Sequence, residues 1–277
     1  MVLPIFTLNK FSLVILTRCN LACKLCCEYV PQHKPFPDMT PEQADQILSA
    51  FFSVVDHVNT LHLTGGGEPF LHKDLDALIE VAMKYQSQFD RLMLFSNSTV
   101  PVSDKLLSVI KKYSDKIVVQ LSRYNVKPDR EQNTVDLLSS QGIRCKIEKY
   151  YGEDQSFGGW IDFGTWEKRN RTPENLSNIF KECSITRAMD GNWRTRDGKV
   201  HWCTRSMRGM ELGYVADQPD EYVDLLDTST SAQEKRQKFE MIANKPYLSA
   251  CDQCSGDLAG TDHEVMRYPA AEQMKKS

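Results

Sequence analysis

The chain has 277 residues, of which 41% are hydrophobic and 26% charged, with a formal net charge of −3. This composition is typical of a globular protein with one large core, alone or with a smaller appended domain. The slightly acidic balance gives no electrostatic case for nucleic-acid binding, and no run of 18 apolar residues predicts a membrane span. The first residues also lack the pattern of a signal peptide. We therefore expect a cytoplasmic protein without nucleic-acid or membrane partners.

Short apolar runs alternate with amphipathic segments over about 140 residues, as in a chain that alternates strands and helices. The runs expected to form strands are residues 11–17, 58–64, 91–97, 116–122 and 144–151. The segments expected to form helices are residues 38–55, 74–86, 104–113 and 129–141. The first of these helices has a strong start, since Thr40 precedes Pro41 and Gln43 completes a capping box. This alternation predicts an α/β fold in which five to six parallel strands form a partial (β/α) barrel.

The alternation breaks down after the fifth strand. Residues 189–203 predict a hairpin with Asp197 and Gly198 at its turn. We therefore expect two domains, a barrel over residues 1–165 and a smaller domain over residues 166–277.

Nine cysteines in a reducing compartment favour metal binding or redox chemistry over disulfides. Cys19, Cys23 and Cys26 form the pattern C-x3-C-x2-C directly after the first strand, at the edge where barrels place active sites. A structural zinc site needs four ligands, and Cys27 is poorly placed to be the fourth because it is adjacent to Cys26. Three close thiolates suit a four-iron cluster with one iron open to a substrate or cofactor. Zinc and free buried thiols are the alternatives.

The triad of Cys19, Cys23 and Cys26 resembles the signature of radical S-adenosylmethionine (radical SAM) enzymes. The sequence "TGGGEP" at residues 64–69 resembles the glycine-rich GGE motif of the same family. Glycines allow a close approach of backbone to a ligand, and Glu68 offers an acceptor for an ammonium group. The resemblance assigns to SAM the residues Gly65, Gly66, Gly67 and Glu68.

Further SAM contacts are implied at three other places. Leu25 stands where the family usually has an aromatic residue near adenine. Ser96 and Asn97 end the third strand and Ser122 ends the fourth, at positions that resemble family sites for the SAM carboxylate and ribose. A turn-capping role is the alternative for Asn97.

A second group of cysteines has the pattern C-x19-C-x47-C-x2-C and consists of Cys183, Cys203, Cys251 and Cys254. The pattern resembles the auxiliary-cluster domain of the SPASM/Twitch subgroup, in the short Twitch form found in an aminocyclitol dehydrogenase. It implies a second four-iron cluster with no open iron, and a structural zinc site is the alternative. Cys27 and Cys145 remain as packing residues or as hydrogen-atom donors.

The resemblance implies two [4Fe-4S] clusters and SAM, with an external electron donor of the flavodoxin or ferredoxin type. SAM would be cleaved to a 5′-deoxyadenosyl radical that abstracts hydrogen from a hydroxyl-bearing carbon of a small molecule. We expect a sugar, nucleotide sugar or cyclitol to be oxidised, with the auxiliary cluster as electron acceptor. The alternatives are a sugar epimerase and a maturase of ribosomal peptides. An iron–sulfur electron carrier does not explain the GGE segment.

Charged and aromatic residues at two strand ends are the candidates for catalysis. Arg123 and Tyr124 end the fourth strand, and Glu148 and Lys149 end the fifth. Salt-bridged residues at the rim of the barrel are the alternative for the charged ones. A basic run around Cys203 could bind an anionic substrate or form a solvated hairpin.

Overall fold

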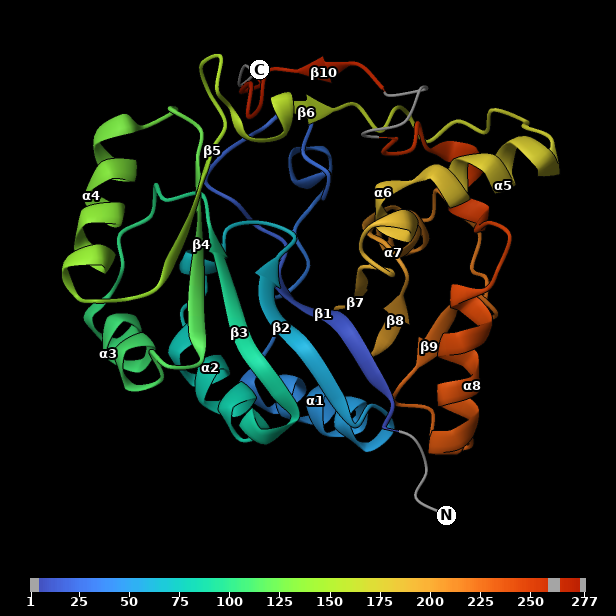
Figure 1. Cartoon of the computed structure of the whole chain (residues 1–277), viewed down its shortest axis with the longest axis horizontal. Helices are drawn as coiled ribbons and strands as arrows, with labels where there is room; N and C mark the ends of the chain where they lie inside the picture. The colour runs from blue at the N-terminus through green and yellow to red at the C-terminus, as the bar shows by residue number, and fades with distance from the viewer. Residues whose placement is uncertain (1–4, 259–264, 275–277) are drawn as a thin grey trace.

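A computed structural model describes residues 5–258 and 265–274. Within these residues the strands form an eight-stranded sheet in the order β5-β4-β3-β2-β1-β7-β8-β9, and β6 pairs with β10 in a separate two-stranded sheet (Figure 1). The first five strands are β1 (Thr7–Leu16), β2 (His57–Gly65), β3 (Phe89–Ser96), β4 (Ile117–Arg123) and β5 (Cys145–Lys149). Their neighbouring pairs are all parallel, which confirms the predicted α/β barrel architecture.

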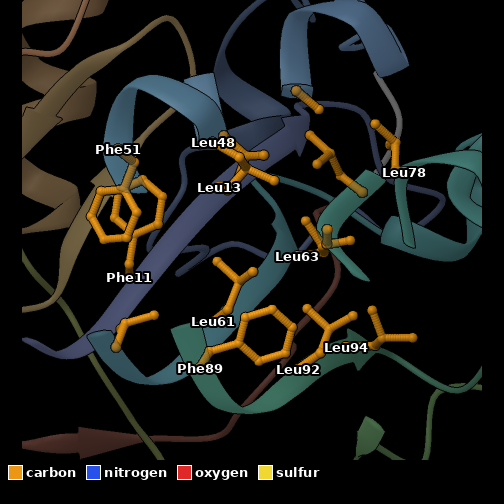
Figure 2. Close-up of a cluster of buried hydrophobic side chains, with 14 of the residues drawn as sticks. Phe11, Leu13, Leu48, Phe51, Leu61, Leu63, Leu78, Phe89, Leu92 and Leu94 are labelled. Carbon is orange, nitrogen blue, oxygen red and sulfur yellow. The ribbon is translucent and has the colours of Figure 1, made fainter. Parts of the chain in front are cut away.

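Helices follow the strands and cover the outer face of this part of the sheet (Figure 1). They are α1 (Pro41–Val54), α2 (Leu75–Met83), α3 (Asp104–Lys112) and α4 (Pro128–Ser140). The predicted capping box is present, since the Thr40 hydroxyl accepts from the Gln43 amide and the Gln43 side chain accepts from the Thr40 amide. Between the helices and the sheet lies the main core, where Phe11 stacks on Phe51 with ring centroids 3.7 Å apart (Figure 2). Burying two such rings contributes about 1.5–3 kcal/mol each.

The C-terminal part extends the same sheet. Strand β7 (Trp193–Thr195) pairs in parallel with β1, and β8 (Lys199–His201) and β9 (Tyr222–Asp224) continue antiparallel. The predicted hairpin is therefore present, and a sixth parallel strand is supplied by β7 at the free edge of β1. The remaining helices are α5 (Pro173–Glu182), α6 (Ser184–Arg187), α7 (Thr204–Glu211) and α8 (Ala232–Ala243).

Two short strands lie above the carboxyl ends of the barrel strands (Figure 1). They are β6 (Trp160–Ile161) and β10 (Arg267–Tyr268), which pair antiparallel. Beyond β10 the chain lies on the first cysteine loop, where the Lys24 amide donates to the Glu272 carbonyl and the Met274 amide to the Ala22 carbonyl, both at 2.7 Å. The 3-10 turns are Val30–Gln32, Pro69–Leu71, Gln86–Gln88, Ser156–Gly158 and Ser249–Gln253.

None of the helices in the described ranges combines the length and the apolar character needed to cross a membrane.

Candidate functional site

The first cysteine loop and the ends of β2, β3 and β4 surround one cavity of about 250 Å³. This volume approaches the range of small-molecule sites, which begins at about 300 Å³. The predicted residues in its wall are Cys19, Cys23, Cys26, Gly65, Gly66, Gly67, Glu68, Ser96, Asn97, Ser122 and Tyr124. Parallel strands explain this convergence, because their carboxyl ends meet at one edge of the sheet.

The first three thiols have surroundings that suit metal-bound thiolates. Cys19 Sγ accepts from the Leu21 amide at 3.4 Å and lies 3.7 Å from Asn97 Nδ2, and Cys23 Sγ accepts from Gln273 Nε2 at 3.3 Å. Burial raises the pKa of Cys19 to about 12 and that of Cys23 to about 11. Buried thiolates therefore require a cationic group between them, and N–H donors to sulfur are typical of iron–sulfur sites. These residues fit the predicted cluster.

The glycine segment lies in close contact with the backbone of residues 16–18. A Cβ on Gly67 would lie 1.9 Å from the Arg18 carbonyl oxygen, and the Glu68 amide donates to the same oxygen at 3.0 Å. The Gly66 amide donates to the Leu16 carbonyl at 2.7 Å. Close approach of the β2 end to the first cysteine loop thus explains Gly67, whereas we predicted these glycines from approach to a ligand.

Both carboxylate oxygens of Glu68 accept hydrogen bonds from backbone amides. Its Oε1 accepts from the Phe70 amide at 3.0 Å and its Oε2 from the Asn97 amide at 2.6 Å. The side chain is 2% exposed, and burial raises its pKa to about 7. Glu68 therefore ties the end of β2 to the end of β3, in addition to lining the cavity where an ammonium acceptor was predicted.

Asn97 makes the turn-capping contact that was given as the alternative, and its contact with SAM stays a prediction. Its Oδ1 accepts from the Thr99 amide at 3.0 Å, as in a turn cap, while Nδ2 donates to Asn20 Oδ1 at 2.9 Å. The residue also lies in the cavity wall. Leu25 lies elsewhere, since it lines a neighbouring cavity between the first cysteine loop and residues 161–166. The structure thus does not bring Leu25 together with the other predicted SAM contacts.

The four catalytic candidates divide between two faces of the sheet. Tyr124 lines the cavity beside Trp160, with ring centroids 5.4 Å apart. Glu148 is paired in register with Ser122, so its side chain shares the cavity face. It is buried and forms an ion pair with Lys146 at 2.7 Å.

The other two candidates require a correction. Arg123 and Lys149 are paired in register one position further along their strands, so strand alternation directs them to the opposite face from Ser122. Lys149 also forms an ion pair with Asp154 outside the cavity. The prediction that these two side chains point into the mouth of the barrel was wrong, because it ignored the period of two along a strand.

The second group of cysteines lines a separate cavity of about 40 Å³. Its wall contains Cys183, Cys203, Cys251 and Cys254. Cys203 Sγ accepts from the Ser206 amide at 3.4 Å, and Cys254 Sγ accepts from the Gly256 amide at 3.3 Å. Burial raises the pKa of Cys251 well above its usual range, and the other three thiols raise it further. The four thiols are half-buried in one cavity wall, and this arrangement again suits a bound cationic group.

Neither group is arranged around one ion in the structure. Across residues 5–258 and 265–274, no three His, Cys, Asp or Glu side chains are placed as ligands of a single metal ion.

The basic run around Cys203 is not a solvated surface. Arg194 is 5% exposed and Arg208 fully buried. Arg194 pairs with Glu28 of the first cysteine loop, and Arg208 pairs with Glu211. The hypothesis that this run binds an anionic substrate, and the alternative of a solvated hairpin, are both contradicted for these arginines.

Sequence reasoning missed several residues of these sites. Glu28 and Trp160 line the first cavity, and Gln273 contacts Cys23. The position of Glu28, two residues after Cys26, was a signal that could have been used. Trp160 and Gln273 come from segments far from the first cysteines in sequence. Arg205 belongs to the basic run around Cys203, and the structure places it in the wall of the second cavity.

Residues 13–130 match the sequence profile described as the Radical SAM superfamily. This range includes the cysteine triad, the glycine segment and the ends of β3 and β4. The N-terminal part of the chain is a radical SAM domain. Radical SAM enzymes bind SAM and a [4Fe-4S] cluster, and the radical SAM domain of this chain presents the thiols and the cavity that these groups need.

One curated protein is similar to part of the chain. The chain is 32% identical over 100 residues to an S-adenosylmethionine-dependent nucleotide dehydratase from Selenomonas ruminantium, which is 35% of this chain and 33% of that protein. The chain thus matches about a third of that relative's length.

Two solved structures are similar along nearly the whole chain. BtrN in complex with AdoMet and 2-DOIA has a TM-score of 0.59 at 14% identity, with 94% of this chain and 98% of BtrN covered. Native anSMEcpe with bound AdoMet has a TM-score of 0.56 at 13% identity, with 93% of each chain covered. The C-terminal part therefore belongs to the shared fold as well.

Proposed function

We propose that this radical SAM enzyme oxidises a hydroxyl-bearing carbon of a small molecule that contains a sugar or cyclitol ring. When bound, SAM and the first cluster would supply a 5′-deoxyadenosyl radical that removes one hydrogen atom from the carbon. The carbon then becomes a carbonyl by losing one proton and one electron. A second cluster would supply the acceptor for that electron. The observation that carries the proposal is the cavity lined by Cys183, Cys203, Cys251 and Cys254. The domain boundary near residue 165 is proposed on the same basis.

The chain's own residues suit a carbohydrate-like ring. Tyr124, Tyr150 and Trp160 form an aromatic group, with Tyr124 and Trp160 in the cavity wall. Such faces bury the apolar side of a ring and exclude water from the reacting carbon. We propose Glu148 as the proton acceptor, since its carboxylate lies on the cavity face of β5. A nucleotide-containing substrate is supported by the name of the Selenomonas ruminantium relative.

Metal and sulfide content tests the proposal. After anaerobic reconstitution we expect about eight irons and eight sulfides per chain, and about four of each after Cys251→Ala and Cys254→Ala are combined. About four irons with one zinc in the parent protein would contradict an internal electron acceptor. A panel of nucleotide sugars, sugars and cyclitols would then be assayed for a carbonyl product, with a flavodoxin- or ferredoxin-type protein as external reductant.

Epimerisation is a second candidate function, favoured by one observation. Cys27 is exposed and lines the first cavity, whereas Cys145 packs against the main core. Cys27 is therefore the free thiol that we propose as hydrogen-atom donor to a substrate radical. In deuterated buffer an epimerase would incorporate deuterium at the substrate carbon, and Cys27→Ala would abolish this incorporation. An oxidase would keep its turnover in that variant. The external electron donor remains necessary in both cases.

A further inference from the structure

Arg205 is buried beside the second group of cysteines. It is the second residue of α7, which begins directly after Cys203, and it is 5% exposed. Its side chain lies in the wall of the cavity that the four thiols line. Burial of an uncompensated charge is costly, so a charged guanidinium in this position requires a partner that stabilises it.

The hydrogen bonds of Arg205 do not neutralise it. Nη1 donates to the Tyr29 hydroxyl and, at 3.3 Å, to the Gly164 carbonyl. Nη2 donates to the carbonyls of Thr165 and Gln253. Every one of these acceptors is neutral. The guanidinium also lies over the Trp166 ring, 3.6 Å from its centroid.

One donor of Arg205 is left over. Among the residues that the structure describes, Nε has no hydrogen-bond acceptor. A buried N–H without a partner costs about 1–3 kcal/mol, so such groups indicate a ligand or a functional role. The four thiols share the cavity wall with Arg205 and would carry negative charge as ligands of a metal cluster.

We propose that Arg205 is a positioning residue for an iron–sulfur cluster held by the second group of cysteines and that it raises the reduction potential of this cluster. One-electron reduction makes the cluster and its thiolates more negative by one unit. A fixed cation and an N–H donor stabilise the more negative state. The electron is the one released by the substrate carbon. This inference rests on the proposed function, because a zinc ion at the same thiols accepts no electron.

The same side chain also joins the two cysteine sites. Tyr29 follows Cys26 by three residues, and its amide donates to the Cys26 carbonyl at 2.9 Å. Arg205 therefore holds the first cysteine loop and the second cysteine site in one arrangement.

The test uses the full chain with Cys19→Ala, Cys23→Ala and Cys26→Ala, so that the second site alone holds iron. The midpoint potential is measured by redox titration followed by electron paramagnetic resonance. We expect Arg205→Gln to lower the potential and Arg205→Lys to lower it less. The matched control is Arg196→Gln, since Arg196 belongs to the same basic run but bonds to Glu211 at 2.7 Å and is not in the cavity wall.

Each outcome decides between the two proposals. If the triple-alanine protein binds zinc without iron, the second cluster and the role of Arg205 both fail. If it binds about four irons and the Arg205 variants have the potential of the control, the role of Arg205 alone is overturned.

A second measurement covers the case in which the Arg205 variants do not fold. Arginine labelled with 15N in the guanidinium is incorporated, and Arg171→Lys removes the arginine that bonds to the Cys251 and Cys254 carbonyls. Pulsed electron paramagnetic resonance of the reduced cluster should then show a 15N coupling. Its absence would contradict a contact between Arg205 and the cluster.

Discussion

At the scale of single residues, Glu68 shows how one side chain serves both the fold and the site. The motif predicted it as an acceptor for a ligand, whereas the structure gives its two oxygens to the Phe70 and Asn97 amides. Two neighbouring strand ends are thereby fixed at the edge of the cavity. The shape of the cavity wall therefore depends on this carboxylate.

We expect Glu68→Gln to lower the free energy of unfolding by about 1–3 kcal/mol, because one buried amide loses its acceptor. Urea unfolding of the two proteins measures the change. The control is Glu80→Gln, whose partner Lys112 is exposed and whose loss should cost less than about 1 kcal/mol. Equal effects at the two positions would contradict this account of Glu68.

The pH dependence of stability provides a separate check on Glu68. Burial raises its pKa in the folded state to about 7, from the ordinary glutamate value of 4.5. The folded state therefore binds the proton more tightly, so this contribution to stability is full below pH 4.5 and is lost as the pH rises to about 7. Between pH 5 and pH 7.5, urea unfolding should show a smaller loss of unfolding free energy in Glu68→Gln than in the parent protein. A loss that is the same in both proteins would assign it to other groups.

At the scale of elements, the end of β2 approaches the first cysteine loop more closely than any side chain would allow. The Cβ of an alanine at position 67 would lie 1.9 Å from the oxygen and 2.4 Å from the carbon of the Arg18 carbonyl. Both are backbone atoms, so no rotamer change relieves the contact.

We expect Gly67→Ala to cost about 3 kcal/mol or more and to reduce iron retention by the cysteine triad. Gly66→Ala is the matched control, since the atom nearest to its Cβ would be in the Thr17 side chain at 3.2 Å. Thermal unfolding and iron content after reconstitution are the measurements. Wild-type iron retention in Gly67→Ala would show that the loop moves without consequence.

At the scale of the whole molecule, the two parts of the chain share one sheet and a buried ion pair. Strand β7 lies directly beside β1, and Arg194 on β7 pairs with Glu28 on the first cysteine loop. The two side chains are 6% and 10% exposed. A C-terminal domain that is only appended would not have these contacts.

Arg194→Met should destabilise the protein by about 3–5 kcal/mol, because it leaves a buried carboxylate unpaired. Adding Glu28→Gln should restore part of this loss, since the remaining charge is removed. A double-mutant cycle by urea unfolding measures the coupling. Additive effects of the two substitutions would mean that the pair contributes nothing specific.

The continuous sheet also predicts a single unfolding transition. All four tryptophans lie at position 160 or later, whereas α1–α4 lie before residue 141. Tryptophan fluorescence therefore reports on the C-terminal part alone, whereas far-ultraviolet circular dichroism also reports on α1–α4. We expect their urea midpoints to coincide. Two separated midpoints would support independent domains divided near residue 165.

The sequence by itself determined the strand–helix alternation, the α1 cap and the two motifs of the first cavity. These features are local, since periodicity, caps and the cysteine triad each depend on residues within a turn or a strand of one another. Only the tertiary structure decided which strand edge β7 joins, which face Arg123 and Lys149 occupy and which partners the buried arginines have. Glu28 and Arg194 are 166 positions apart, and Gln273 and Cys23 are 250 apart. Such contacts follow from register and packing of distant segments, and no local pattern carries that information.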